Sequence, residues 1–258
     1  MAAITVHRST GSNSGSLAAL KLENFTRLSE EDRAALVHLS KRVSTVDPRR
    51  DLVSEGERPT HVHLMLQGWA ARYKTLPDGR RQIVGLFVPG DFFDLNVYIL
   101  RRMDHTIGAI TRVKVAMITP DEMDWLTSNF PRVTQALFWN ELVSAATQRE
   151  WFLNAAQRTA FERLAHLFAE LYLRLSAVGR THDGGYDLPL TQNDLAETTG
   201  LTPVHVNRML QELRRDGLIE LERKQLRIPD IHRLMEVSMY NPNYLHLDHE
   251  GAHFDANA

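Results

Sequence analysis

The sequence of 258 residues contains no cysteine. This absence excludes cysteine-ligated iron–sulfur clusters, thiolate haem ligation, disulfide switches and a cysteine nucleophile. The chain also lacks an apolar run of about 18 residues, the length that a membrane-spanning helix requires. Its N-terminus has no apolar stretch of the signal-peptide kind, so we expect a cytoplasmic protein without a membrane partner.

Net charge is also small. The 30 Lys and Arg residues are balanced by 32 Asp and Glu residues, which gives a formal net charge of -2 at pH 7. Hydrophobic residues make up 43% of the chain and charged residues 24%, as in a globular protein with room for two modest domains. Because the overall charge does not point to a polyanionic partner, evidence for nucleic-acid binding must come from a local pattern.

Such a pattern lies between residues 190 and 219, which predict two helices joined by a tight turn. Thr191 begins a capping box with the acidic residue three positions later, so a helix should start there. Gly200 suits the sharp turn that follows. Thr202 can cap the second helix, and Pro203 fits its first turn, where an amide hydrogen would have no partner in any case.

The second of these helices has two different faces. Apolar residues recur at i, i+3, i+4 and i+7 and should form a buried stripe of Val206, Met209, Leu210 and Leu213. The other face suits the DNA major groove, where Arg pairs with guanine, Asn or Gln with adenine, and a methyl group with thymine. The residues predicted to contact DNA here are Thr202, Pro203, Val204, His205, Asn207, Arg208, Gln211 and Arg215.

A short basic hairpin follows this helix. It favours DNA binding over the alternative, an ordinary helical hairpin whose polar face is only solvated. Strand-like alternation at residues 218–222 and 226–228 surrounds the tip Arg223-Lys224-Gln225. Such a hairpin is the wing of a winged helix-turn-helix, and we predict that Lys224 contacts phosphates. Double-stranded DNA is therefore the expected partner.

The first half of the chain predicts a small β domain. Between residues 53 and 118, short apolar runs alternate with turn residues, among them Pro77-Asp78-Gly79 and Pro89-Gly90-Asp91. Evenly spaced short strands of this kind predict an antiparallel barrel or roll. We assign residues 21–130 to this sensor domain and expect residues 1–20 to be disordered.

Further helices are expected before and after the roll. The first should run from Leu28 to Arg42 under a Ser29 cap. Its inward-facing residues would be Leu36, Leu39 and Val43. A later helix, Arg158 to Ala177, opens the predicted winged helix-turn-helix domain of residues 157–235. A polar linker over Gly179 to Asp187 should connect that helix to the helix-turn-helix.

The longest predicted helix starts at Pro131 and reaches about Ala155. Its first half is apolar on nearly every side, and about 35 Å of helix is more than a small roll can cover. We therefore assign residues 131–156 to dimerisation, although the imperfect a/d repeat does not predict a simple coiled coil. The residues expected at the interface of this homodimer are Leu137, Leu142, Val143 and Ala146. A helix buried within one subunit is the alternative.

The order of these parts resembles the Crp/Fnr family of bacterial transcription regulators. The resemblance covers residues 22–235 and is carried by Gly56, Gly68, Pro89-Gly90-Asp91-Phe92 and above all residues 190–219. It implies an α+β fold with an N-terminal antiparallel β-roll like a cyclic-nucleotide-binding domain, a long dimerisation helix and a C-terminal winged helix-turn-helix. It also implies a homodimer that reads a two-fold symmetric operator and contacts RNA polymerase.

The chain departs from the cyclic-AMP-binding members in two sensor segments. In those members, a Glu after the Gly-Asp-Phe segment holds the ribose, and an Arg followed by Ser or Thr neutralises the phosphate. Here the segments are Phe93-Asp94-Leu95-Asn96 and Met103-Asp104-His105-Thr106, so a phosphate would face Asp104 without a guanidinium. Arg101 and Arg102 are close in sequence but out of register.

We therefore expect a sensor roll that does not suit cyclic AMP, with no cofactor and an unknown effector. Aromatic side chains should fill the vacated space rather than line a pocket. The residues assigned to this space are Trp69, Phe87, Phe92, Phe93, Asp94, Asn96, His105 and Thr106. A filled space favours a regulator without effector control. In the recognition helix, Pro203 and Val204 replace the Arg and Glu of the cyclic-AMP type, which implies a different base preference.

A cupin-like metal-binding roll fused to a DNA-binding domain is the rival hypothesis. His61 and His63 precede a Pro-Gly turn, but Gln67 stands where a carboxylate ligand is needed. Histidines and acidic residues in the C-terminal tail, residues 236–258, predict no more than adventitious metal binding. The sequence shows no Walker loop, Gly-rich dinucleotide turn or Ser-His-Asp arrangement, so we expect neither a catalytic nor a metal site.

Overall fold

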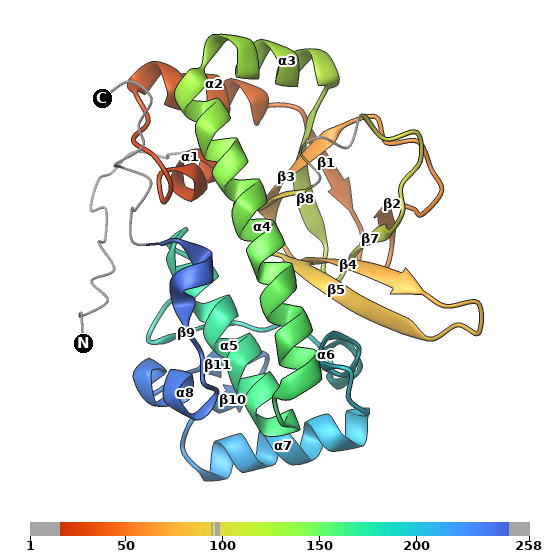
Figure 1. Cartoon of the computed structure of the whole chain (residues 1–258), viewed down its shortest axis with the longest axis vertical. Coiled ribbons are helices and arrows are strands. Elements are labelled where there is room, and N and C mark those ends of the chain that lie inside the picture. The colour runs from red at the N-terminus through yellow and green to blue at the C-terminus, as the bar shows by residue number, and fades with distance from the viewer. Residues whose placement is uncertain (1–15, 94, 96–98, 248–258) are drawn as a thin grey trace.

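The computed structural model describes residues 16–93, 95 and 99–247. Figure 1 shows a β-roll on one side, the long helix α4 (Pro131–Gln157) running beside it, and a C-terminal domain below. The predicted α+β architecture is confirmed. Residues 1–15 and 248–258, which belong to the predicted disordered start and the predicted tail, lie outside the described residues.

Two four-stranded antiparallel sheets form the roll. One has the strand order β1-β8-β3-β6 and the other β2-β7-β4-β5. The strands are β1 (Val43–Val46), β2 (Asp51–Val53), β3 (Val62–Gln67), β4 (Ala70–Thr75), β5 (Arg81–Phe87), β6 (Phe92–Phe93), β7 (Thr106–Ala109) and β8 (Val113–Ile118). Inward-facing side chains from both sheets meet in one cluster that includes Met65, Phe87, Phe93, Ile107 and Val115.

Two helices precede the roll, and both correct the prediction made from the sequence. α1 (Leu17–Leu22) packs against α2 and α4 and buries two alanines, so the expected disorder is wrong for residues 17–20. Their burial depends on partners that lie far away in the sequence. α2 (Glu30–Leu39) starts at the predicted Ser29 cap. It ends before Val43, which begins β1 and is 49% exposed instead of facing inward.

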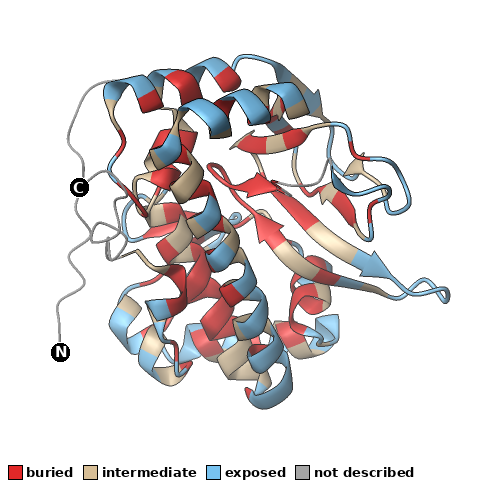
Figure 2. Cartoon of the chain, turned by 45° about the horizontal axis from the view of Figure 1, so that its top comes forward, coloured by how far each residue is buried: buried red, intermediate tan, exposed pale blue. Residues whose placement is uncertain are grey.

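The helix α3 (Pro120–Asn129) connects the roll to α4 and was not predicted. Its signal is present in the sequence, because Thr119 and Glu122 form a capping box and Pro120 takes the first helical position. The long helix α4 has 27 residues and matches the predicted one. Figure 2 shows that buried and exposed positions alternate around it. No helix in the described part of the chain combines the length and apolarity needed to cross a membrane.

Four α-helices and a small sheet make up the C-terminal domain. They are α5 (Ala160–Ser176), α6 (Gln192–Thr199), α7 (Pro203–Arg215), α8 (Ile231–Val237), β9 (Gly185–Asp187), β10 (Glu220–Glu222) and β11 (Gln225–Arg227). α5 begins later than predicted because Arg158 is extended and Thr159 caps the helix. The expected polar linker is wrong at residues 185–187, where β9 pairs with β11 and buries Tyr186 completely.

The chain folds back after α8 instead of continuing as a free tail. The 3-10 helix η2 (Pro242–Leu245) packs against α4, and Tyr240, Tyr244 and Leu245 are buried. The Tyr244 hydroxyl donates a hydrogen bond of 2.8 Å to Glu170 Oε2. The tail prediction is therefore wrong for residues 236–247, because their packing partners come from distant helices.

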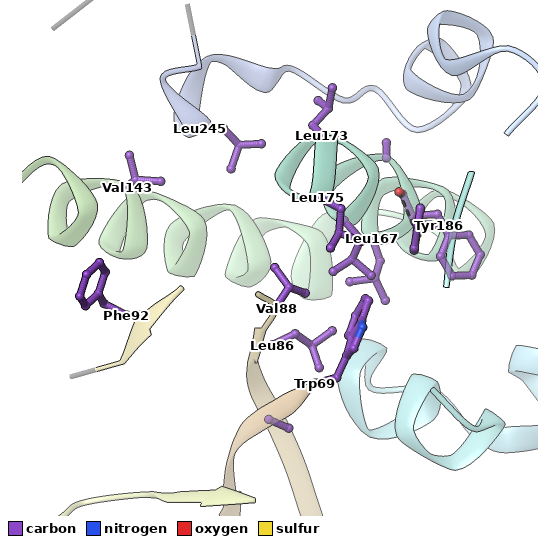
Figure 3. Close-up of a cluster of buried hydrophobic side chains, with 14 of the residues drawn as sticks. Trp69, Leu86, Val88, Phe92, Val143, Leu167, Leu173, Leu175, Tyr186 and Leu245 are labelled. Atoms are coloured by element: carbon purple, nitrogen blue, oxygen red, sulfur yellow. Dashed lines mark hydrogen bonds between the residues drawn. The ribbon is translucent and has the colours of Figure 1, made fainter. Parts of the chain in front are cut away.

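The roll and the C-terminal domain share a hydrophobic core. Figure 3 shows Trp69 and Leu86 of the roll packed among side chains of the C-terminal domain, including Leu175 and Tyr186. The ring centroids of Trp69 and Tyr186 are 6.5 Å apart and nearly parallel. Burial of this joint surface holds the two parts in one orientation.

A buried ionic network reinforces the same junction. Asp91, at the turn before β6, lies 3.0 Å from Lys21 Nζ of α1 and 2.8 Å from Arg174 Nη2 of α5. Arg174 also pairs with Glu170 at 3.0 Å. Because all four side chains are almost inaccessible to water, each charge depends on its neighbours for compensation.

Candidate nucleic-acid interface

The first helix of the helix-turn-helix is α6. Thr191 Oγ1 accepts a hydrogen bond of 3.2 Å from the Asp194 amide, and Asp194 Oδ2 accepts one of 2.8 Å from the Thr191 amide. This is the predicted capping box. The helix ends at Gly200, whose φ of 69° lies in the left-handed region that favours glycine. The predicted helix start and turn are thus both confirmed.

The second helix, α7, is held by its apolar stripe. Thr202 Oγ1 accepts a hydrogen bond from the His205 amide, and Pro203 takes the first helical position. The predicted stripe is buried in full and consists of Val206, Met209, Leu210 and Leu213. α7 packs against α5 and α6 and lies at the lower edge of the molecule in Figure 1. The packed stripe fixes the rotation of the helix, so its polar face turns outward.

The side chains predicted to contact DNA share this outer face. The exposed ones are Thr202, Pro203, Val204, Arg208, Gln211 and Arg215, and the half-buried ones are His205 and Asn207. Arg208 Nη2 lies 2.8 Å from His205 Nε2 in a hydrogen bond. Gln211 Nε2 donates to Asn207 Oδ1 at 2.9 Å. The side chains predicted to read bases therefore include two pairs whose members are hydrogen-bonded to each other.

Arg215, at the end of α7, is already engaged with acidic side chains. Its Nε donates a hydrogen bond of 3.1 Å to Asp216 Oδ1, and its Nη2 lies 3.8 Å from a Glu212 carboxylate oxygen. These carboxylates compete with any phosphate for the guanidinium. Arg215 is therefore a weaker candidate for a phosphate contact than its exposure suggests.

The wing is the hairpin of β10 and β11. Leu221 pairs with Leu226, and the two strands are joined by Arg223 and Lys224. Both tip residues adopt positive φ, 47° and 65°, as the central residues of a tight two-residue hairpin turn do. Lys224 is exposed at the tip, as the predicted phosphate contact requires. β9 completes the sheet on the other side of β11.

The roll contacts the helix-turn-helix through ion pairs. The Arg49 guanidinium donates two hydrogen bonds to the Asp194 carboxylate, at 2.9 and 3.2 Å, and Arg81 Nε donates one of 2.7 Å to Glu197. Burial by itself would raise the pKa of Asp194, but hydrogen bonds from Arg49 and Thr191 hold that pKa below its ordinary value. Sequence reasoning missed Arg49 and Arg81 because their partners lie 145 and 116 positions away.

The aromatic residues assigned to the sensor space do not form one cluster. Phe87 and Phe93 lie inside the roll with ring centroids 4.6 Å apart. Phe92 faces the opposite side of its strand and belongs to the core shared with α4, and Trp69 packs on Tyr186 at the domain junction (Figure 3). This corrects the expectation for Phe92 and Trp69. Asp94 and Asn96 lie outside the described residues.

His105 and Thr106 make polar contacts at the edge of the roll. Thr106 Oγ1 accepts a hydrogen bond of 3.0 Å from the Glu55 amide. His105 Nδ1 lies 2.6 Å from Asp104 Oδ1, and this hydrogen bond lowers the pKa of Asp104. Arg72 Nε donates to His105 Nε2 at 3.2 Å. Sequence reasoning missed this guanidinium, which comes from β4 and reaches the segment only because β4 pairs with β7.

The four residues expected at a dimer interface lie on two sides of α4. Leu137, Val143 and Ala146 are buried against their own chain, because the roll, α1 and η2 cover that side. Leu142 faces outward and is 59% exposed. This corrects the expected interface, since buried side chains cannot meet a second copy without unpacking the subunit.

The histidines considered for metal binding fall in two separate places, on the roll and next to α4. His61 and His63 have ring centroids 6.5 Å apart, and His63 stacks on Phe93. His246 lies beside Trp139, with ring centroids 5.2 Å apart, and the remaining tail histidines are outside the described residues. Within the described part of the chain, no three His, Asp or Glu side chains are placed to hold a metal ion together.

Comparisons with known proteins agree on both domains. The model of the Crp-like helix-turn-helix domain matches residues 162–237, and that of the cyclic nucleotide-binding domain matches residues 44–130. The chain is 30% identical over 214 residues to the transcriptional activator protein FnrL of Cereibacter sphaeroides, which covers 81% of this chain and 85% of that protein. It is 31% identical over 186 residues to the nitrogen fixation regulation protein FixK of Bradyrhizobium diazoefficiens. This match covers 71% of this chain and 76% of that protein.

Solved structures show the same fold. FixK2 from Bradyrhizobium japonicum superposes with a TM-score of 0.67 at 24% sequence identity, over 75% of this chain and 95% of that one. TTHB099, a transcriptional regulator from Thermus thermophilus, superposes with a TM-score of 0.60 at 20% sequence identity, over 76% of this chain and 96% of that one. The roll, the long helix and the winged helix-turn-helix thus recur as one arrangement.

Proposed function

Because this chain belongs to the Crp/Fnr family of transcription regulators, we propose that it binds DNA as a homodimer on a two-fold symmetric operator. The chain is a regulator with a helix-turn-helix DNA-binding domain, and its relatives are not enzymes. One α7 helix would enter the major groove of each half-site. The observation that carries the proposal is the outer face of α7, where Arg208 and the Asn207–Gln211 pair stand opposite a fully packed stripe.

An exposed stripe on α4 supports the dimer. Its members are Phe138, Leu142, Ala145, Arg149, Phe152 and Ala156. Steps of four and three residues alternate between them, which is the heptad spacing of a coiled coil. Phe138 and Phe152 are 65% and 77% exposed, so a single chain leaves a large apolar surface in water. A second α4 helix would cover this stripe, and we place the subunit seam there.

Two-fold symmetry then fixes the geometry of the operator. An interface between identical α4 stripes relates the two α7 helices by a two-fold axis. Half-sites read this way lie about 34 Å apart, one turn of DNA. From the family we also propose RNA polymerase as a second partner and the cytoplasm as the place of action.

We further propose that the roll does not respond to cyclic AMP or cyclic GMP. Phe87 and Phe93 occupy its interior, and Arg101 and Arg102 are exposed instead of turned toward it. The Arg72 guanidinium is hydrogen-bonded to His105 and lies 5.0 Å from the centre of the Phe87 ring. These features favour the hypothesis that DNA binding needs no nucleotide effector.

Selection of genomic fragments by the purified chain tests the proposal. We expect enrichment of a palindromic sequence and two chains per operator, the latter measured by sedimentation of the complex. The selection is run with and without cell extract, because an effector would appear as a requirement for the extract. Enrichment of no sequence, or one chain on an asymmetric site, would contradict the proposal.

A further inference from the structure

The first turn of α7 presents apolar surface to water. Val204 is 82% exposed, the largest fraction among the large hydrophobic side chains of the described residues, and Pro203 beside it is also exposed. A single exposed valine is common on protein surfaces. This one is on the same face as Arg208, and a β-branched residue is a weaker helix former than most alternatives. Neither packing nor helix propensity therefore accounts for valine at this position.

From this placement we infer that Val204 determines base specificity by contacting the 5-methyl group of a thymine in each half-site. The inference rests on the proposed function, since it concerns the same α7 face. Valine has neither a donor nor an acceptor, so it reads a base only through apolar contact. In the major groove, thymine is the base that displays a methyl group, whereas cytosine displays an amino donor that valine would leave unpaired.

The position of that thymine follows from the helix. Val204 and Arg208 are four residues apart and are neighbours on one helix face. Four residues rise about 6 Å along the axis, and adjacent base pairs are about 3.4 Å apart. The hydrogen bond from Arg208 to His205 keeps the guanidinium on this face. We therefore expect the thymine within two base pairs of the guanine that Arg208 contacts.

Uracil tests the contact directly, because it differs from thymine only in lacking the methyl group. In the selected operator, each thymine is replaced by deoxyuridine, one symmetric pair at a time, and affinity is measured by fluorescence anisotropy. The wild type should lose about fourfold per half-site, or about 15-fold for the symmetric operator, at one thymine position near the guanine, as expected for one buried methyl group.

The Val204→Ala variant completes a double-substitution cycle. It should bind the thymine operator about as weakly as the wild type binds the uracil operator, and the uracil exchange should not weaken it further. Its thermal midpoint should match that of the wild type because the side chain is exposed. Val37→Ala is the matched control. Val37 is an exposed valine on α2, and this variant should keep the full response to the methyl group.

Two outcomes would overturn the assignment of Val204. The wild type could bind every uracil-substituted operator as tightly as the original, or Val204→Ala could keep the wild-type response to the methyl group. Either result would leave DNA binding intact and remove only this inference. Failure to bind any selected operator would instead overturn the proposed function, and the inference with it.

Discussion

On the outer face of α7, hydrogen bonds between neighbouring side chains limit their freedom before DNA is bound. Gln211 Nε2 donates a hydrogen bond of 2.9 Å to Asn207 Oδ1, and Arg208 Nη2 forms one of 2.8 Å with His205 Nε2. Side chains that are already oriented lose less conformational entropy on binding. Among the described residues no carboxylate pairs with Arg208, whereas Arg215 is held by Asp216. At the scale of residues, Arg208 is thus the best placed to read a base.

Replacing Arg208 with alanine should weaken the specific complex and relax the preference at one base pair. A guanidinium that pairs with guanine contributes about 1–3 kcal/mol of binding free energy per half-site. Alanine cannot make this contact, so the variant should no longer prefer guanine at that position. Anisotropy titrations on the operator and on single-base variants would measure the effect. Equal losses on every sequence would show that Arg208 contacts phosphate instead.

The variant Lys224→Ala is the matched test for the wing. Lys224 is exposed at the tip of the β10–β11 hairpin, and we expect it to contact a phosphate and not a base edge. Its loss should lower the affinity for all DNA sequences alike. It should also reduce the slope of log affinity against log salt concentration by about one per half-site. A change in base preference would place the wing in a groove and contradict the docking geometry.

The helix α4 carries apolar residues on two sides. Its inner side buries Leu137, Val143 and Ala146 within the subunit, and its outer side carries the stripe that includes Leu142. A helix with one apolar face needs one packing partner. Because α4 has apolar residues on a second side, it can also pack against a second α4 helix. This explains why its a/d repeat is hard to see in the sequence. The residues of the inner face are interspersed among those of the outer one.

The variant Leu142→Glu should give a folded monomer. A carboxylate in the α4 seam would be unpaired and desolvated in a dimer, but it is solvated in a single chain because this position is exposed. Operator affinity should fall by about 100-fold or more, since both half-sites must be engaged together. Light scattering gives the mass, and Val37→Glu on α2 serves as the exposed control. A wild-type monomer at micromolar concentration would exclude the seam.

At the scale of the whole molecule, the roll, α1 and the C-terminal domain are joined by the charges around Asp91. The carboxylate contacts Lys21 and Arg174, and Arg174 contacts Glu170 in turn. Burial by itself would raise the pKa of Asp91, but the two cations outweigh it and hold that pKa below the ordinary value. The ionised form is therefore favoured by folding.

The variant Asp91→Asn should lose about 3–5 kcal/mol of stability at pH 7, because buried Lys21 loses its carboxylate partner and buried Arg174 keeps only Glu170. The folded pKa of Asp91 is depressed, so its contribution is complete above the ordinary value of 3.8 and is lost as the pH falls through the lower folded value. Urea unfolding at several pH values should show the difference from wild type shrinking below pH 3.8. Asp78→Asn, at an exposed turn, should leave the urea midpoint unchanged at pH 7.

Cyclic AMP and cyclic GMP should neither bind with useful affinity nor change operator binding. An effector acts only through different affinities for two conformations, and a roll filled by its own aromatic side chains offers it no such difference. Titration calorimetry with each nucleotide is the measurement. A micromolar dissociation constant with a tenfold gain in operator affinity, about 1.4 kcal/mol, would contradict this. Loss of that response in Arg72→Ala would then identify the phosphate contact.

Features that depend on short-range chemistry can be predicted from the amino-acid sequence. The caps at Thr191 and Thr202, the turn at Gly200 and the α7 stripe all follow from residues within one or two helical turns of each other. Strands between turn residues predicted the roll in the same way. Most of the helix-turn-helix could therefore be placed without coordinates, and so could the order of the domains.

Features that depend on partners far apart in the chain become visible when the chain is folded. The burial of Tyr186 in β9, the return of η2 onto α4 and the Arg49–Asp194 contact each join segments that the sequence separates. The same holds for Arg72, which reaches His105 through strand pairing, and for the two faces of α4. Local pattern shows that a residue is apolar or charged, but the packed fold determines which neighbour satisfies it.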